Sequence, residues 1–221
     1  MKTIAKIHTE FPTKFGIPRQ SGIIETLRGT IVFEPEYRNV DAVRGLEAFS
    51  HLWLIWEFSE AKRDTWSPTV RPPRLGGNTR KGVFATRSPF RPNPIGLSCV
   101  KLERIETDPK QGPVLHVLGA DLMDGTPIYD IKPYIVYTDS HPEAVSGFAD
   151  KPAERLLEVD GPEPLLQRVE ESLRESLLAV LAHDPRPQYQ DDPERVYGLA
   201  FGGMEVKFKV DGMRLTVLEV K

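Results

Sequence analysis

The chain has 221 residues, of which 39% are hydrophobic and 28% are charged, and its formal net charge is −3 at pH 7. That length allows a main domain with a substantial core and a small second domain. One cysteine excludes an intramolecular disulfide framework, and with no signal-peptide core or bilayer-length apolar run we expect a soluble, cytoplasmic protein.

The first two-thirds of the chain are predicted to be strands and loops. Runs of β-branched and aromatic residues indicate strands at 29–33, 51–58, 114–118 and 135–137. Between the first two, Asp41 can cap a short helix whose apolar face carries Val43, Leu46 and Phe49. Short strands without long helices between them favour an antiparallel β-barrel or sandwich over a doubly wound sheet.

The last third is predicted to be a small α+β domain. A polar, proline-rich connection precedes apolar residues that recur at helical spacing from Leu165 to Leu181, which predicts an amphipathic helix docked on the strands that follow. Those strands are expected at 204–210 and 213–220, around a hairpin turn at Asp211-Gly212. We therefore expect a mainly β protein with an antiparallel barrel (1–140), a linker (141–163) and a small C-terminal α+β domain (164–221).

Charge is distributed unevenly along the chain. Between Lys62 and Arg104 there are ten basic and two acidic residues, whereas the rest of the chain has 19 basic and 30 acidic ones. A basic run is usually only a solvated face. This one also contains Trp66 and a proline-stiffened loop, and that combination is typical of nucleic-acid binding.

The proline-stiffened loop runs from Gly82 to Gly96 and reads GVFATRSPFRPNPIG. Its three prolines fix their own φ and restrict the residues before them, so the backbone is stiff before any ligand binds. Arg87 and Arg91 are therefore held in defined directions, and guanidinium groups match the geometry of carboxylates and phosphates. The loop predicts a site for an anionic or carboxylate-bearing ligand.

Further loops carry polar side chains. Residues 15–22 hold an arginine and a glutamine with many hydrogen-bonding groups, and residues 70–78 hold two arginines on a polyproline-stiffened backbone that suits phosphates. The segment Asp124–Pro127 is by itself an ordinary turn. Residues 130–134 combine a carboxylate, an ammonium and a phenol, which fits either acid–base chemistry or a salt-bridged strand end.

Several common kinds of site are excluded by spacing. There is no Gly-x-Gly-x-x-Gly or Walker-type loop, which argues against a Rossmann or P-loop nucleotide site. The five histidines lack His-x-x-x-His spacing and no Cys-x-x-Cys is present, so we expect no metal. With one cysteine and no nucleophile elbow, covalent catalysis has no support.

Taken together, these loops resemble the TsaA-like family, also called TrmO. The resemblance covers about residues 1–137 and rests on the core Arg-Pro-Asn-Pro-Ile-Gly at 91–96, with support from 15–20, 41–51, 71–78, 124–134 and, for bacterial members, 184–189. It implies a β-barrel tRNA methyltransferase that uses S-adenosylmethionine (SAM) and acts as a homodimer. The implied substrate is threonylcarbamoyladenosine beside the anticodon, methylated on the adenine exocyclic nitrogen.

The resemblance also implies the cofactor contacts, namely Pro18, Arg19, Gln20, Phe58, Ser59, Arg87, Leu97, Asp124, Gly125, Thr126 and Pro127. This set suits SAM, which offers a carboxylate to an arginine, hydroxyls and an ammonium to a carboxylate, and an adenine to apolar groups. The accepting nitrogen is a poor nucleophile, so a base that takes its proton would help. Because they follow the cofactor turn, we nominate Asp130 first and Tyr134 second as catalytic residues.

The basic segment is then a predicted tRNA track. Its expected contacts are the phosphate-binding Arg71, Arg74, Arg80 and Lys81 and the stacking residue Trp66. Two alternatives stay open at this point: a non-catalytic module that binds tRNA or a small ligand, and a methyltransferase for another RNA or a small molecule. No membrane or metal partner is expected.

Overall fold

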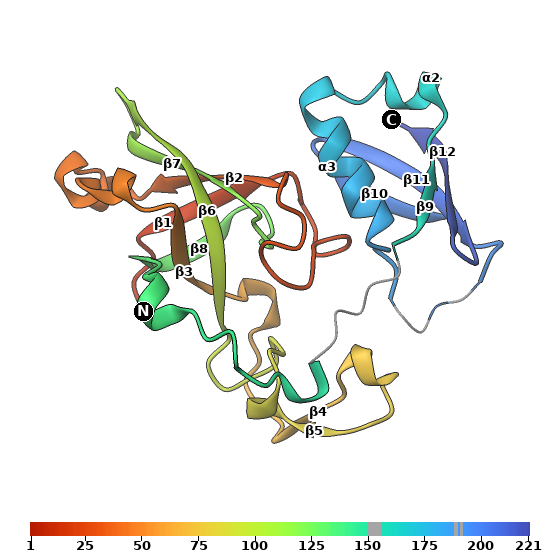
Figure 1. Cartoon of the computed structure of the whole chain (residues 1–221), viewed down its shortest axis with the longest axis horizontal. Helices are drawn as coiled ribbons and strands as arrows, with labels where there is room; N and C mark the ends of the chain where they lie inside the picture. The colour runs from red at the N-terminus through yellow and green to blue at the C-terminus, as the bar shows by residue number, and fades with distance from the viewer. Residues whose placement is uncertain (150–155, 188–189, 191) are drawn as a thin grey trace.

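The N-terminal domain is a closed six-stranded barrel in the computed structural model, which describes residues 1–149, 156–187, 190 and 192–221 (Figure 1). Its strands are β1 (Ala5–Thr9), β2 (Arg28–Phe33), β3 (His51–Glu57), β6 (Ile95–Asp108), β7 (Gly112–Leu118) and β8 (Thr126–Pro133). Neighbours are antiparallel in the order β1-β2-β7-β6-β3-β8, and β8 closes on β1. The mainly β architecture with an antiparallel barrel is confirmed.

Alternating apolar residues fill the barrel. In β3, Leu52, Leu54 and Trp56 are buried while the residues between them are partly exposed, as expected for a strand with one face on a core. The other strands contribute Ala5, Ile7, Ile31, Val100, Leu115, Val117 and Ile128 to the same core.

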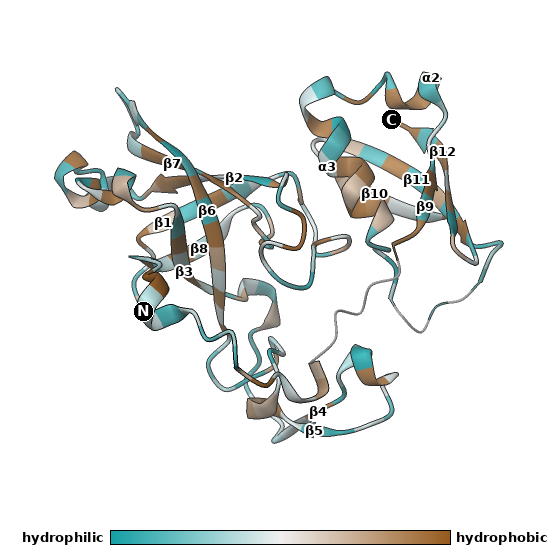
Figure 2. Cartoon of the chain, viewed as in Figure 1, coloured by the Kyte–Doolittle hydropathy of each residue, from teal (hydrophilic) through white to brown (hydrophobic). Residues whose placement is uncertain are grey.

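The C-terminal domain is a four-stranded sheet in the order β10-β11-β12-β9, with two helices. Its elements are β9 (Glu158–Asp160), α2 (Glu163–Leu166), α3 (Glu171–Ala182), β10 (Tyr197–Phe201), β11 (Met204–Asp211) and β12 (Arg214–Val220). The predicted hairpin around Asp211-Gly212 is confirmed. Leu177, Val180 and Leu181 bury the apolar side of α3 in the core of this sheet, which confirms its predicted docking face (Figure 2).

Two predictions in the last third differ from the structure. The single helix expected from Leu165 to Leu181 is divided into α2 and α3. The expected linker contains a strand of the C-terminal sheet, since β9 pairs with β12 in parallel; residues 150–155 of that linker lie outside the described residues.

Two predictions in the first two-thirds were wrong. In place of a helix at 41–49 the chain forms separate 3₁₀ turns at Val40–Val43 and Leu46–Ala48, because Gly45 between them adopts a φ of 87°. Residues 135–137 are not a strand but the start of α1 (Val136–Asp139). The Asp139 carboxylate accepts the N–H of Ile135 at 2.8 Å and so caps that turn.

The connection between β3 and β6, residues 58–94, forms a separate lobe beside the barrel, and we call it the basic excursion (Figure 1). It contains the small sheet of β4 (Thr69–Val70) and β5 (Lys81–Gly82) and 3₁₀ helices at Ser59–Ala61, Pro73–Leu75 and Val83–Ala85. In the part of the chain that the structure describes, no helix has the length and apolar character needed to cross a bilayer.

Candidate functional site

Three connections meet at one end of the barrel, which we call the loop rim. They are residues 10–27 between β1 and β2, the basic excursion between β3 and β6, and residues 119–125 between β7 and β8. The antiparallel register places Ile7 opposite Thr126 and Glu57 opposite Ile95, so all three connections leave the barrel at this end. The predicted cofactor residues all lie in these connections or at the first residues of β6 and β8.

The loop that contains Pro18–Gln20 is attached to the start of β6. The Arg87 guanidinium donates to the Gln20 side-chain oxygen, and the backbone N–H of Cys99 donates to Ser21 Oγ at 3.0 Å. This edge of β6 is available because β6 pairs with β7 only from Lys101 onward. These contacts bring Gln20 to Arg87 and Ser21 to β6, and Leu97 lies two residues before Cys99 on that strand with 56% of its surface exposed.

Asp121, which was not among the predicted site residues, connects the start of β6 to the loop of residues 10–27. Ser98 Oγ donates to Asp121 Oδ1 at 2.6 Å and accepts from Trp56 Nε1 at 2.9 Å. Burial raises the pKa of the Asp121 carboxyl to about 6, although hydrogen bonds from Ser98 and from the Ser21 backbone, and the charge of Arg87, act to lower it. The available signal was a lone carboxylate between apolar residues at 120 and 122, both buried.

Arg19, in the loop of residues 10–27, is within reach of charges from both the C-terminal domain and the basic excursion. Burial lowers the pKa of its guanidinium; the charge of Asp184 raises that pKa and the charge of Arg74 lowers it further. Asp184 belongs to the C-terminal domain and also binds the Arg186 guanidinium through both carboxylate oxygens, at 2.8 and 3.0 Å. Residues 188 and 189 of this segment lie outside the described residues.

Phe58 and Ser59 close the base of the basic excursion. The Phe58 N–H donates to the carbonyl of Pro94 at 2.8 Å, and its ring lies 4.2 Å from that of Trp56. Arg91, in the proline-stiffened loop, donates to the carbonyl of Thr86 at 3.0 Å, so this arginine stabilises the loop itself.

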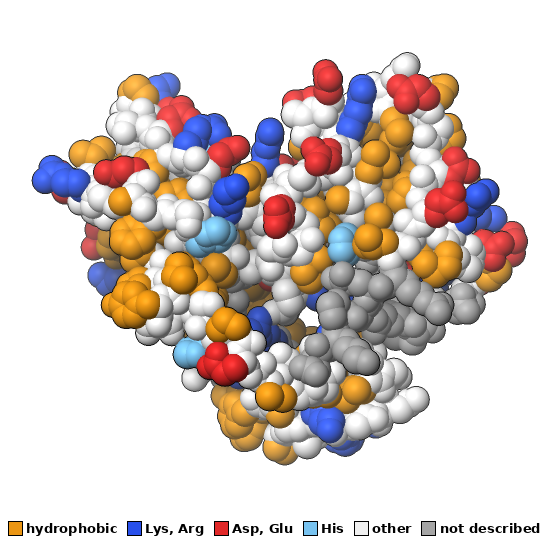
Figure 3. Space-filling view, in the orientation of Figure 1, with side chains coloured by type: hydrophobic (Ala, Val, Ile, Leu, Met, Phe, Trp, Pro, Cys, Tyr) orange, Lys and Arg blue, Asp and Glu red, His pale blue; other side chains and the backbone are white. Residues whose placement is uncertain are grey.

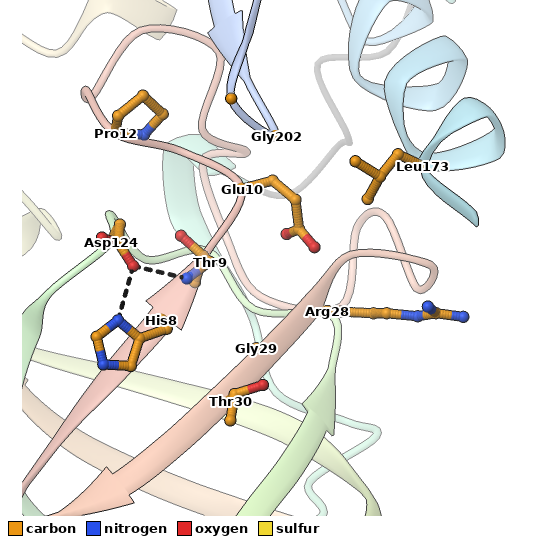
Figure 4. A pocket seen from close by; sticks show the side chains of 11 residues that line it. His8, Thr9, Glu10, Pro12, Arg28, Gly29, Thr30, Asp124, Leu173 and Gly202 are labelled. Atoms are coloured by element: carbon orange, nitrogen blue, oxygen red, sulfur yellow. Dashed lines mark hydrogen bonds and ion pairs between the residues drawn. The ribbon is translucent and has the colours of Figure 1, made fainter. Parts of the chain in front are cut away.

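Asp124 also lies at the loop rim, beside the end of β1. Its carboxylate accepts from His8 Nδ1 and from the Thr9 N–H, both at 3.1 Å (Figure 4). It lines a groove of about 460 Å³ between the barrel and the C-terminal domain, together with Glu10 and Arg28. Burial raises the pKa of Glu10. Pro18–Gln20, Arg87 and Leu97 do not line this groove.

The two nominated catalytic residues lie on the outer face of the barrel at different heights. Asp130 pairs with Ile55, which pairs with Leu97, so these three side chains share one cross-strand row. The Tyr134 N–H donates to the carbonyl of His51, two rows further from the rim, about 13 Å along the strand. Asp130 therefore lies near a predicted cofactor residue, and Tyr134 does not.

Hydrophobic side chains and a few basic ones are exposed on the visible face of the basic excursion, the lower lobe in Figure 3. Trp66 is 55% exposed and Phe84 72% exposed, and their ring centroids are 6.1 Å apart. The Arg63 guanidinium lies 3.9 Å above the ring of Phe90. Of the predicted phosphate contacts, Arg71 and Arg80 are exposed, while Arg74 and Lys81 are partly buried.

Two family models of known proteins match the two domains of this chain. Residues 6–140 match the model of the tRNA-methyltransferase O N-terminal domain, and residues 161–221 match that of the TrmO C-terminal domain. The chain belongs to the TrmO family. The resemblance seen in its loops is confirmed, and the second match covers the C-terminal domain, of which the resemblance included only residues 184–189.

Individual TrmO relatives align over most of the chain. The tRNA (adenine(37)-N6)-methyltransferase of Escherichia coli K12 is 41% identical over 215 residues, 94% of this chain and 91% of that protein. A Pseudomonas aeruginosa relative, also 41% identical over 215 residues (92% and 89%), is provisionally named an S-adenosylmethionine-dependent methyltransferase. The crystal structure of TrmO from Pseudomonas aeruginosa superposes with a TM-score of 0.81 at 35% identity, covering 100% of this chain and 96% of that one.

Proposed function

We propose that this chain is a SAM-dependent methyltransferase that methylates the exocyclic N6 of adenine 37 in tRNA carrying threonylcarbamoyl on that nitrogen. Membership of the TrmO family and the names of its relatives support the tRNA adenine chemistry. The observation that carries the proposal is the loop rim. There the contacts of Arg87 with Gln20 and of Ser21 with Cys99 gather the predicted cofactor loops beside the basic excursion.

The residues of the rim fit SAM by their chemistry. Arg87 and Arg19 suit its carboxylate, the exposed Leu97 suits the adenine, and the Asp124 carboxylate suits ribose hydroxyls. SAM supplies an electrophilic methyl group when bound. The chain itself must hold the accepting nitrogen in line and exclude water.

The acceptor side of the site is assigned to Asp130 and the basic excursion. The lone pair of the accepting nitrogen is delocalised into the ureido carbonyl and the purine, so a carboxylate that accepts its proton accelerates transfer. Asp130 shares a row with Leu97 and is the first candidate for that base. Arg71 and Arg80 suit tRNA phosphates, and the exposed rings of Trp66 and Phe84 suit unpaired bases of the anticodon loop.

The working form is proposed to be a cytoplasmic homodimer, as the family resemblance implies. Sedimentation velocity at micromolar concentration measures the state directly.

Labelled SAM tests the proposed function. The protein is incubated with bulk tRNA that contains or lacks threonylcarbamoyladenosine, and the nucleosides are analysed by mass. Label on the modified adenosine alone supports the proposal. Label on another nucleoside indicates a different acceptor, and no labelled nucleoside in either pool indicates a binding module without turnover.

A further inference from the structure

The apolar side chains of the loop of residues 10–27 pack into the core of the C-terminal domain rather than into the core of the barrel, while its backbone hydrogen-bonds to the connection between β7 and β8. Phe11, Ile24 and Leu27 have exposed fractions of 1%, 4% and 1% and belong to the same hydrophobic core as the strands and helix of that domain. Phe15 and Ile17 pack against this core from the same loop. The barrel core contains none of these five side chains.

Specific contacts fix this docking at both ends of the loop. Near its start, the Gly202 N–H donates to the carbonyl of Glu10 at 2.8 Å, and the rings of Phe11 and Phe201 meet edge to face at 5.3 Å. Near its end, Ser176 Oγ donates to the carbonyl of Thr26 at 2.9 Å.

Between these ends the fit is close. Gly16 adopts a φ of 89°, and a Cβ placed there would lie 2.4 Å from Leu199 Cδ1, so the backbone itself packs on β10. The segment Pro18–Gln20 follows at once, before the next buried anchor at Ile24. The charge of Asp184, from the loop after α3, acts on Arg19 within this segment.

We propose that the C-terminal domain is the positioning element of the cofactor loop, with Ser176 and Leu199 as positioning residues that set its conformation before SAM binds. This rests on the proposed assignment of Pro18–Gln20 to SAM. A loop ordered in advance loses less conformational entropy on binding, so the docking contacts contribute to SAM affinity without touching the cofactor.

The test uses the full chain with Ser176→Ala and Leu199→Ala, and with Val217→Ala as the matched control. Val217 is buried in the same core, but β11 separates its strand from β10. We expect the first two variants to weaken SAM binding at least tenfold by calorimetry, and to raise the KM for SAM while kcat stays within twofold. Val217→Ala should leave the Kd unchanged at temperatures where all variants are folded.

Hydrogen exchange of the ligand-free protein gives a readout that needs no cofactor. Amides of residues 15–24 should exchange faster in Ser176→Ala and Leu199→Ala than in Val217→Ala. Unchanged exchange and an unchanged Kd in both variants overturn the inference, and Ser176→Ala decides if Leu199→Ala does not fold. If wild type fails to bind SAM, the proposed function fails, and with it the cofactor part of this inference.

Discussion

Asp121 makes the stability of the protein depend on pH in an unusual direction. Burial raises its pKa from 3.8 to about 6, so the folded chain keeps a proton at pH values where the unfolded chain has lost it. Because the folded state binds more protons in that window, this group's contribution to the free energy of unfolding falls as the pH rises from about 4 to about 6. The group therefore opposes folding at neutral pH.

Replacing this carboxyl with an amide should remove the dependence. Asp121→Asn keeps an oxygen for the Ser98 hydroxyl but has no proton to lose. We expect the variant to gain about 2 kcal/mol relative to wild type between about pH 4 and about pH 7, measured by urea unfolding at both values. A stability difference that does not change with pH would show that Asp121 titrates normally.

Asp130 and Tyr134, the two candidate bases, lie at different distances from the loop rim. Asp130 shares the row of Leu97 and is paired with Lys132 at 2.9 Å, whereas the Tyr134 ring packs against Trp53 at 5.6 Å. We expect Asp130→Asn to lower kcat about 100-fold with the SAM Kd unchanged, and Tyr134→Phe to stay within threefold. Single-turnover transfer to modified tRNA measures both. Equal losses in the two variants would remove Asp130 from this role.

At the scale of elements, local patterns predicted what local forces determine. The hairpin of β11 and β12 was found because alternating residues and an Asp-Gly turn specify it within one short segment. The strand expected at 135–137 failed because the decisive contact is distant: Asp139 accepts from Trp53 Nε1 at 2.9 Å, 86 positions away, as well as from Ile135. That contact has no signal in the local sequence.

The residues of the candidate site also fall into two groups, those that the local sequence predicts and those that depend on distant contacts. The proline-stiffened loop and the resemblance it carries identified Arg87 and Leu97, because backbone restriction can be read from the prolines themselves. Asp121 and Ser176 were not predicted, because their hydrogen-bond partners Ser98 and Thr26 lie 23 and 150 positions away and become neighbours only when the barrel closes and the domains dock. The apolar neighbours of Asp121 suggest a buried carboxyl but do not identify its partner.

The basic excursion is the element on which RNA binding can be tested without disturbing the cofactor loop. Arg74 is close enough to act on Arg19, so Arg71, which is exposed, is the cleaner position. We expect Arg71→Ala to weaken tRNA binding and to reduce the slope of log K against log salt by about 0.7–0.9, the value for one phosphate contact. Filter binding from low to high salt measures that slope.

Arg44→Ala is the matched control for this measurement. Arg44 is 78% exposed and pairs with Asp41 beyond the end of β2, at the opposite end of the barrel from the rim. Its loss should leave the slope unchanged. If both variants reduce the slope equally, the excursion is not a specific track and tRNA is attracted by general surface charge.

At the scale of the whole molecule, the shared loop couples the two domains. Residues 10–27 connect two barrel strands but bury Phe11, Ile24 and Leu27 in the C-terminal core, so neither domain can unfold without exposing apolar surface of the other. Calorimetry should therefore show one cooperative transition, with calorimetric and van't Hoff enthalpies that agree.

Ligand dependence of that transition tests the coupling further. SAM at 100 times its Kd contributes about 2.7 kcal/mol, which for a chain of this length raises Tm by about 5–10 °C. Because the cofactor loop belongs to both domains, the whole transition should shift as one peak, followed in parallel by tryptophan fluorescence, to which Trp53 and Trp56 in β3 of the barrel contribute. Two peaks of which only one moves would mean that the domains unfold independently, and that the docking of the loop adds nothing to the stability of the barrel.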